Sequence, residues 1–246
     1  MLYSAAMTAS PAAGEPLRAA AMSLVKICGL ATAEALEAAL AAGADMVGFV
    51  RFPRSPRHVS LEAGRALSRA AAGRATRVLL LVDPADAELD EAVAAIEPDL
   101  IQLHGRETPE RAAAIRAQTG RPVMKALAVA EAADLARIDL YRASAERILL
   151  DAKPPKGAAL PGGNGVAFDW RLLAGLAKAP SHALMLSGGL TPENVAEAVA
   201  VSGLSAVDVS SGVESSPGIK DISKIAAFVK AARAAFAARD KDRRVA

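Results

Sequence analysis

The sequence contains one cysteine, few aromatic residues and no long apolar run. A single cysteine among 246 residues excludes an intrachain disulfide bond and is typical of a reducing compartment, so we expect a cytoplasmic protein. No stretch reaches the roughly 18 consecutive apolar residues that a transmembrane helix needs. The sequence therefore predicts neither a disulfide framework nor an association with a membrane.

Basic stripes, nucleotide loops and clusters of metal ligands are missing as well. Lys and Arg are scattered along a chain of net charge +2, whereas a nucleic-acid-binding protein more often carries a basic stripe with interleaved aromatic residues. No GxxxxGK[ST] loop occurs. One cysteine and three dispersed histidines form no group with the spacing of metal ligands. We expect a small-molecule ligand, no nucleic acid and no metal.

The residues that are present fit one α/β domain. Hydrophobic residues make up 52% of the chain and alanine dominates, which favours helices that pack closely on a sheet. Residues 1–22 carry one arginine and no compact apolar stretch, so they make a poor signal peptide. We expect a dispensable or mispredicted leader over 1–22, with Met7 or Met22 as alternative starts. A single domain should cover 23–238, followed by a polar tail over 239–246.

Short β-branched or Leu-rich segments alternate with Ala-rich amphipathic segments along this domain. Eight strands, each followed by a helix, indicate a parallel sheet that closes into a (β/α)8 TIM barrel. The alternative is an open doubly wound sheet, but its glycine-rich turn should follow the first strand, where the chain reads Lys26-Ile27-Cys28-Gly29-Leu30. The predicted strands are Leu24–Cys28, Asp45–Val50, Arg77–Val82, Leu100–His104, Val123–Leu127, Arg147–Asp151, Ala183–Ser187 and Ala206–Val209. The predicted helices are Thr32–Ala42, Leu61–Ala71, Asp86–Ile96, Pro109–Gln118, Ala130–Ile138, Asp169–Ala177, Pro192–Val201 and Asp221–Ala238.

Two connections are longer than the others, over 51–60 after the second strand and 152–168 after the sixth. Both follow the carboxyl end of a strand, which is the face where barrels build their active sites. Long loops at that face are more often functional than accidental. The prolines and glycines of 152–168 favour a lid, with an insertion of no function as the alternative.

The turns after the seventh and eighth strands are rich in glycine and serine. The first contains Gly188 and Gly189, and the second contains Ser210, Ser211 and Gly212. Glycine lets the backbone approach a ligand closely, and the amides of these two turns form the usual phosphate site of phosphate-handling barrels. The alternative is that the glycines only make tight turns. Two such turns at these strands favour a bound phosphate that belongs to a substrate.

Cys28 and Asp151 end the first and sixth strands. Cys28 is either a small buried hydrophobe or a thiolate favoured by the N-terminus of the following helix. Asp151 emerges from an apolar segment, where burial favours a protonated carboxyl that can act as a general acid; the alternative is a carboxylate paired with Lys153 or Lys156. Because these strands lie three apart in a ring of eight, the two side chains should face each other.

Arg57 and His104 are further candidates for contact with a ligand. Arg57 lies in the long loop after the second strand, and its planar guanidinium suits a carboxylate or a phosphate. Arg51 and Arg54 compete for that role, although a solvated surface charge describes them better. His104 ends the fourth strand, where a structural histidine and a contact with the pocket are both compatible with the sequence.

Together these residues resemble the phosphoribosylanthranilate isomerases, a family of tryptophan biosynthesis. The resemblance runs from about Val25 to Val229, and the motifs in this order are highly specific although no single one is. They are Val25–Leu30 (VKICGL), Gly48–Val50 (GFV), Ser55–Arg57 (SPR), Gln102–Gly105 (QLHG), Leu149–Asp151 (LLD), Leu186–Leu190 (LSGGL) with Asn194, and Val207–Glu214 (VDVSSGVE). Arg51 departs from the family, which more usually has an apolar or aromatic residue after Gly-Phe-Val.

The resemblance implies an Amadori rearrangement of N-(5'-phosphoribosyl)anthranilate to 1-(2-carboxyphenylamino)-1-deoxyribulose 5-phosphate. It implies that Asp151 protonates the furanose ring oxygen as general acid, that Cys28 removes the proton from sugar C2 as general base, and that Arg57 contacts the anthranilate carboxylate. It implies no cofactor. Either a monomer or a homodimer is compatible with it.

Two other functions use the same predicted fold. A Schiff-base aldolase would need Lys125 or Lys153 as nucleophile, but no second lysine constellation that could activate either is visible. A non-catalytic phosphosugar-binding barrel would bind without turnover, yet nothing in the sequence looks like a degraded site. The sequence favours the isomerase.

Overall fold

The computed structural model describes residues 23–154, 157–158, 160–163, 165, 167–176 and 183–245. The predicted leader over 1–22 and Lys156, one of the two lysines considered as a partner of Asp151, lie outside the described residues. The predicted lid is described only in part.

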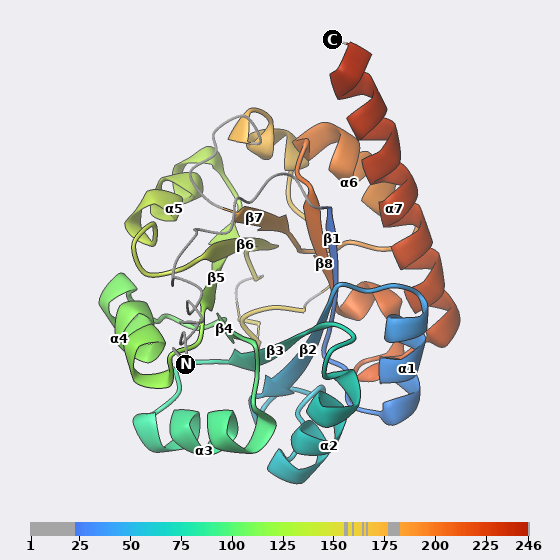
Figure 1. Ribbon diagram of the computed structural model, residues 1–246. Coiled ribbons are helices and arrows are strands. Elements are labelled where there is room, and N and C mark those ends of the chain that lie inside the picture. Colours follow the sequence, from blue (N-terminus) through green and yellow to red (C-terminus); the bar gives the residue numbers. More distant parts are fainter. Residues whose placement is uncertain are drawn as a thin grey trace, which may run out of the picture.

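Eight parallel strands form a closed barrel in chain order, in which β8 pairs with β1 (Figure 1). This confirms the predicted (β/α)8 fold. All eight predicted strands are present, with ends that move by two residues at most. They are β1 (Leu24–Cys28), β2 (Met46–Arg51), β3 (Thr76–Leu81), β4 (Leu100–Leu103), β5 (Val123–Val129), β6 (Arg147–Ala152), β7 (Ala183–Leu186) and β8 (Ala206–Val209).

Helices surround the barrel, as Figure 1 shows. Several begin where the sequence supplies a hydroxyl cap: Thr32, Ser60 and Thr108 each accept the backbone amide three residues further on. The α-helices of the described chain are α1 (Ala33–Ala41), α2 (Leu61–Ala71), α3 (Asp86–Ile96), α4 (Pro109–Thr119), α5 (Arg137–Leu140), α6 (Val195–Ser202) and α7 (Ile222–Val245). A small hairpin of β9 (Glu214–Ser216) and β10 (Ile219–Lys220) follows β8.

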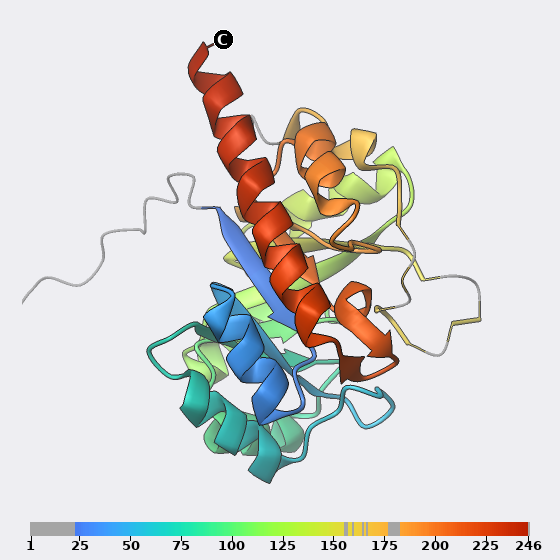
Figure 2. The ribbon, with the colours of Figure 1, turned by 90° about the vertical axis from the view of Figure 1, so that its right-hand side faces the viewer.

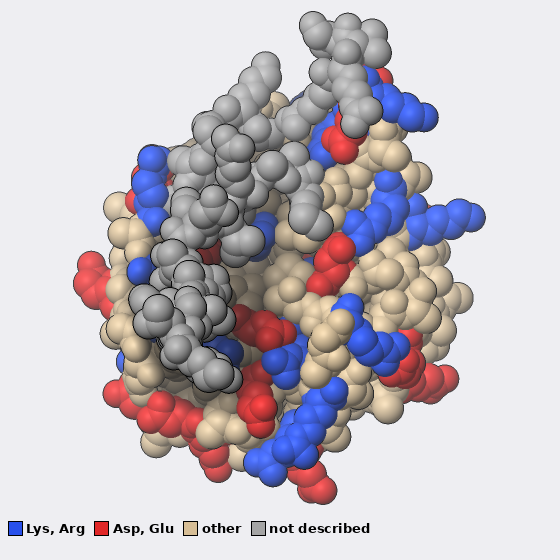
Figure 3. Space-filling model, in the orientation of Figure 1, with Lys and Arg blue, Asp and Glu red and all other residues tan. Residues whose placement is uncertain are grey.

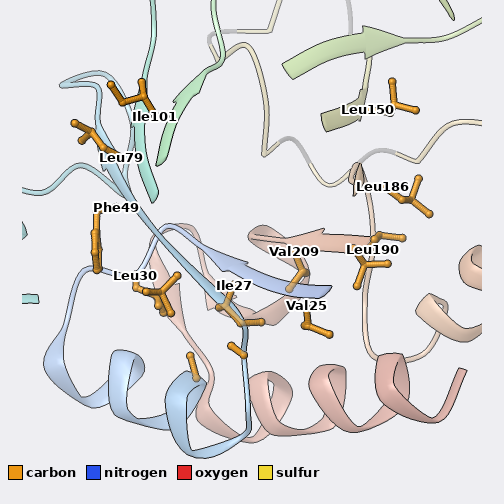
Figure 4. Packing of buried hydrophobic residues seen from close by; sticks show 14 of the residues in the cluster. Val25, Ile27, Leu30, Phe49, Leu79, Ile101, Leu150, Leu186, Leu190 and Val209 are labelled. Carbon is orange, nitrogen blue, oxygen red and sulfur yellow. The ribbon is translucent and has the colours of Figure 1, made fainter. Parts of the chain in front are cut away.

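Alternate residues of each strand face the helices and the barrel interior. Val25 and Ile27 of β1 point outward into the main hydrophobic cluster, together with residues such as Phe49 and Leu79 (Figure 4). The intervening Lys26 and Cys28 therefore point inward. A second apolar cluster fills part of the interior, and it comprises Met46, Val78, Leu100, Met124, Ala126, Leu149, Met185 and Ala206. The interior is thus a packed core, and its mouth is left to carry chemistry.

The predicted helices after β5 and β6 are wrong in type and length. Instead of Ala130–Ile138 the structure has a 3-10 helix, η1 (Ala132–Ala136), followed by the short α5. The Asp134 carboxylate accepts the amides of Ala130 and Glu131, which favours a turn over an α-helix at this point.

Instead of Asp169–Ala177 the described part of that segment has the 3-10 helix η2 (Trp170–Leu173), while Ala177 lies outside the described residues. Asp169 caps η2 by accepting the amide of Arg171. Ala174 leaves the helical conformation with a ψ of 123°, and Gly175 follows with a φ of 96°, which favours glycine.

Two helix ends also differ from the predictions. Helix α6 begins at Val195 rather than Pro192, because the side chain of Asn194 accepts the Thr191 amide and so caps a turn before the helix. Helix α7 does not end at Ala238 but continues to Val245, through most of the predicted polar tail. Arg239 is buried in that segment and donates to the Leu204 carbonyl. The end of α7 projects past the barrel in Figure 2.

The surface of the described residues shows no basic stripe on the face seen in Figure 3, where lysine and arginine alternate with aspartate and glutamate around the rim. No helix among the described residues is both long and apolar enough to cross a membrane.

Candidate active site

One cavity at the carboxyl ends of the strands brings together eight of the nine predicted site residues. These eight are Cys28, Arg57, His104, Asp151, Gly188, Gly189, Ser210 and Ser211. The segments after β6 and β8 lie at this end of the barrel, on the right in Figure 2. Leu160, Pro161, Gly162, Gly163 and Gly165 of the long connection after β6 also line the cavity. Parallel strands explain the convergence, because all their carboxyl ends meet at one face.

Cys28 lies at the end of β1 and is 4% exposed. Burial raises the pKa of its thiol, while the positive charge of Lys26 acts in the opposite direction. The sequence alone suggested that a helix N-terminus favours the thiolate, but α1 starts only at Ala33, with Thr32 as its cap. The cationic neighbour of Cys28 in the structure is Lys26, on the same strand.

Asp151 and His104 form a hydrogen-bonded pair in the cavity. Asp151 Oδ2 lies 3.2 Å from His104 Nε2, and its Oδ1 accepts the Ala152 amide at 2.9 Å. Neither Lys153 nor any other described lysine pairs with Asp151: Lys153 lies 3.8 Å from Asp134 instead. Gly162 packs against this pair, and a Cβ atom there would lie 2.7 Å from Asp151 Oδ2. The connection after β6 therefore covers Asp151.

Gln102 determines which nitrogen of His104 carries the proton. Its amide Nε2 lies 3.0 Å from His104 Nδ1, so the amide donates and Nδ1 accepts. The proton of a neutral imidazole is then on Nε2, which faces Asp151. His104 is therefore placed to orient the Asp151 carboxyl group and to donate a hydrogen bond to it.

Arg57 enters the cavity already held on one edge by Glu214. Its Nε and Nη2 donate to the two carboxylate oxygens of Glu214 at 2.7 and 2.8 Å. Lys220 also donates to Glu214, at 2.8 Å. Burial raises the pKa of the Glu214 carboxyl, but Arg57 and Lys220 together hold it below its usual value. The rest of the guanidinium lies against Gly163: Nη2 also donates to the Gly163 carbonyl at 3.4 Å, and Nη1 is the nitrogen that donates to no acceptor among the described residues.

The turns after β7 and β8 present free backbone amides. Among the described residues, the amides of Gly188, Gly189 and Ser211 donate to no protein acceptor. Gly188 and Gly189 have φ of 83° and 64°, which favours glycine at both positions. The Ser210 hydroxyl is engaged, since it donates to the Cys28 carbonyl and accepts from Lys220.

Gly212 does not line the cavity. A Cβ atom there would overlap the Leu190 carbonyl, so Gly212 lets the two turns pack against each other. We expected the missing side chain of Gly212 to leave room for the phosphate. The structure corrects this expectation, because the space is filled by the backbone of Leu190.

Of the two lysines that the alternative aldolase could use, Lys153 lines the cavity and Lys125 does not. Lys125 is fully buried and donates to Glu107 at 2.7 Å and to the Gly105 carbonyl at 2.8 Å. Burial lowers the pKa of Lys125, but the side chain is absent from the cavity wall.

The two arginines that competed with Arg57 lie elsewhere. Arg51, at the end of β2, donates to the Val59 carbonyl, and Arg54 is exposed. No group of three possible metal ligands exists in the described part of the chain.

Comparison with known proteins identifies the protein family to which this barrel belongs. The profile of the N-(5'phosphoribosyl)anthranilate (PRA) isomerase family matches residues 25–231. The chain belongs to this family.

Three relatives show how completely the chain matches other PRA isomerases. The N-(5'-phosphoribosyl)anthranilate isomerase of Azorhizobium caulinodans is 66% identical over 214 residues, which cover 87% of this chain and 93% of that protein. A solved phosphoribosyl anthranilate isomerase in complex with reduced 1-(o-carboxyphenylamino)-1-deoxyribulose 5-phosphate has a TM-score of 0.74 and 36% identity, and covers 87% of this chain and 100% of its own. Solved monomers of the dimeric enzyme from Thermotoga maritima have a TM-score of 0.73 and 36% identity, with the same coverage.

Sequence reasoning missed several residues that the structure places around this PRA isomerase site. They are Lys26, Gln102, Gly162, Asp208, Glu214 and Lys220. Lys26 and Asp208 carried a usable signal, because a charged residue within an otherwise apolar strand has to be paired when it is buried. Glu214 ends the Val207–Glu214 motif but received no role, and Lys220 carried no signal, since it follows in a segment that reads as polar loop.

Proposed function

We propose that this chain converts N-(5'-phosphoribosyl)anthranilate to 1-(2-carboxyphenylamino)-1-deoxyribulose 5-phosphate in tryptophan biosynthesis. The observation that carries the proposal is a single cavity with Cys28, Asp151 and Arg57 in its wall, beside free amides of the β7 turn. One solved member of the family binds the reduced form of this product. No cofactor or metal is needed for the reaction.

The two side chains divide the proton transfers. Asp151 donates a proton to the furanose ring oxygen, the bond from C1 to that oxygen breaks, and the nitrogen lone pair forms the C=N bond of an iminium ion. The Cys28 thiolate then removes the C2 proton, and the electron pair of the C–H bond forms a C1=C2 double bond as the C=N electrons return to nitrogen. The resulting enolamine tautomerises to the ketone. An iminium ion makes the adjacent C–H acidic, so a thiolate is a sufficient base.

Replacing Arg57 with alanine should raise KM about 10–100-fold, because a charge-assisted contact to the anthranilate carboxylate is lost. Arg57→Lys should restore little. One ammonium group cannot hold both oxygens of Glu214, as the guanidinium does, and still present an edge to a ligand. Steady-state kinetics at fixed pH measure both variants, with Arg54→Ala as the control from the same loop. A normal KM for Arg57→Ala would remove this residue from the substrate site.

Inorganic phosphate should act as a competitive inhibitor, because the free amides of Gly188, Gly189 and Ser211 can bind any phosphate dianion. Apparent KM should rise with phosphate concentration while kcat stays constant. Sodium chloride of matched ionic strength serves as the control for general screening. Inhibition that lowers kcat without affecting KM would place the phosphate somewhere else.

The decisive test of the proposed function follows the disappearance of phosphoribosylanthranilate fluorescence, with the substrate made in situ. Wild-type protein should consume it without any added cofactor, including in the presence of a chelator. A barrel that only binds phosphosugars would show saturable binding and no loss of signal, and a Schiff-base aldolase would be trapped covalently by borohydride. Either result would refute the isomerase.

The remaining expectations concern partners and boundaries. We infer that the chain acts on a small phosphorylated molecule in the cytoplasm, without nucleic acid or membrane, as a monomer or a homodimer. The Thermotoga maritima relative is described as dimeric. We also infer that the domain begins near residue 23, so that a chain starting at Met22 keeps full activity. Light scattering and the activity of that shorter chain test these two points.

A further inference from the structure

We propose that Lys26 is a positioning residue that holds the Sγ atom of Cys28 and stabilises its thiolate, while Asp208 keeps Lys26 protonated. The inference depends on the proposed function only in taking Cys28 as the base. Nothing in the acid–base mechanism above uses Lys26 or Asp208, although both are buried and charged inside the barrel.

The strand register brings the three side chains together. Lys26 and Cys28 are two residues apart on β1, so both side chains point into the barrel. Lys26 lies opposite Asp208 in the pairing of β1 with β8, and its Nζ is 2.8 Å from Asp208 Oδ1. The other oxygen of Asp208 accepts the Ser187 hydroxyl at 3.1 Å. Lys26 and Asp208 therefore both have buried partners.

Gly48 supplies the space in which Lys26 and Cys28 meet. It lies opposite Cys28 in the pairing of β1 with β2. A Cβ atom on Gly48 would lie 2.9 Å from Cys28 Sγ and 3.3 Å from Lys26 Nζ. Both atoms thus occupy the volume of a missing side chain, which fixes the thiol beside the ammonium group.

The charges explain why such an arrangement is needed. Burial by itself raises the pKa of the Cys28 thiol and so disfavours the base. Three charged groups act on it: Lys26 on β1 lowers the thiol pKa most strongly, Asp208 on β8 raises it, and Lys220 on β10 lowers it. Burial also lowers the pKa of Lys26, but Asp208 and Cys28 more than compensate, so the pKa of Lys26 is raised and its charge persists.

The test uses the fact that Cys28 is the only cysteine of the chain, so that the ultraviolet absorbance of thiolate reports on it alone. The titration midpoint is measured for the full-length protein, with Cys28→Ser as the baseline. In Lys26→Met the midpoint should rise by about 1–3 pH units, the usual effect of losing an adjacent opposite charge. At pH values below this midpoint, the thiolate fraction of the variant should fall about tenfold for each pH unit, and kcat/KM should fall with it. Activity should return as the pH is raised.

Two further variants separate this role from damage to the fold. Lys26→Met leaves the buried Asp208 without its counter-charge. The double variant Lys26→Met/Asp208→Asn replaces the whole ion pair with neutral side chains. The titration midpoint of Cys28 in this double variant should also exceed that of the wild type. Lys125→Met is the matched control, because it removes an equally buried lysine that pairs with Glu107 at 2.7 Å. This control should lose thermal stability and keep the wild-type midpoint.

A folded Lys26→Met or double variant with the wild-type midpoint would overturn the proposal, as would an equal rise in Lys125→Met. Loss of activity that is uniform across pH would do the same, since it indicates structural damage. The thiol titration needs no substrate. If the midpoints move as expected but the wild type lacks isomerase activity, the proposed function fails and the role of Lys26 stands.

Discussion

Asp151→Asn is expected to lower kcat by about 10²–10⁴-fold, the usual contribution of a general acid, while KM changes little. The amide keeps the size of the carboxyl group and can still accept the hydrogen bond from His104 Nε2 that Asp151 Oδ2 now receives. It cannot give a proton to the furanose ring oxygen. Stopped or continuous fluorescence kinetics under saturating substrate measure the loss directly.

The same substitution at an exposed carboxylate provides the control for Asp151→Asn. Asp139 pairs with Arg142 on the surface, and Asp139→Asn should leave kcat unchanged. Gln102→Leu tests the orientation of the acid through its neighbour, because His104 then loses the donor that holds its proton on Nε2. Its kcat should fall less than that of Asp151→Asn. Near-normal turnover of Asp151→Asn would show that another group protonates the ring oxygen.

Cys28→Ser is expected to lower kcat by a similar factor, about 10²–10⁴-fold. An alcohol is a much weaker acid than a thiol, so the serine side chain cannot supply an anionic base near neutral pH. Cys28→Ala should be at least as inactive. Circular dichroism and thermal melting should show that both variants fold, because serine and alanine fit the space of a side chain that is 4% exposed.

The pH dependence of kcat/KM gives an independent reading of Cys28. Burial raises the pKa of its thiol, so the proton-free base accumulates only as pH rises through that raised value. Wild-type kcat/KM should therefore climb with pH on its acidic side, at a pH above that of an ordinary thiol, and this limb should vanish in Cys28→Ser. An alanine variant with near-normal turnover would make Cys28 a core residue and the mechanism wrong.

Local patterns in the sequence were sufficient for the fold and for the face on which the site lies. Apolar strands alternate with helices, and in a parallel barrel every strand delivers its last residue to the same end. Cys28, Asp151 and Arg57 could therefore be placed together without coordinates. Local patterns failed where one side chain made a contact that periodicity does not show: Asp134 favours a 3-10 turn after β5, and Arg239 anchors α7 beyond its predicted end.

Only the tertiary structure decided which charges face each other. Lys26 pairs with Asp208 across the closure of the barrel, 182 residues away, and Arg57 pairs with Glu214 at a separation of 157 residues. These contacts depend on strand register and on the packing of loops that local periodicity does not encode. A buried charge must find a counter-charge wherever the fold brings one within reach, because its removal from water is otherwise too costly. The sequence by itself thus determined the barrel and the end at which its loops meet, and tertiary contacts determined how Cys28, Asp151 and Arg57 are held.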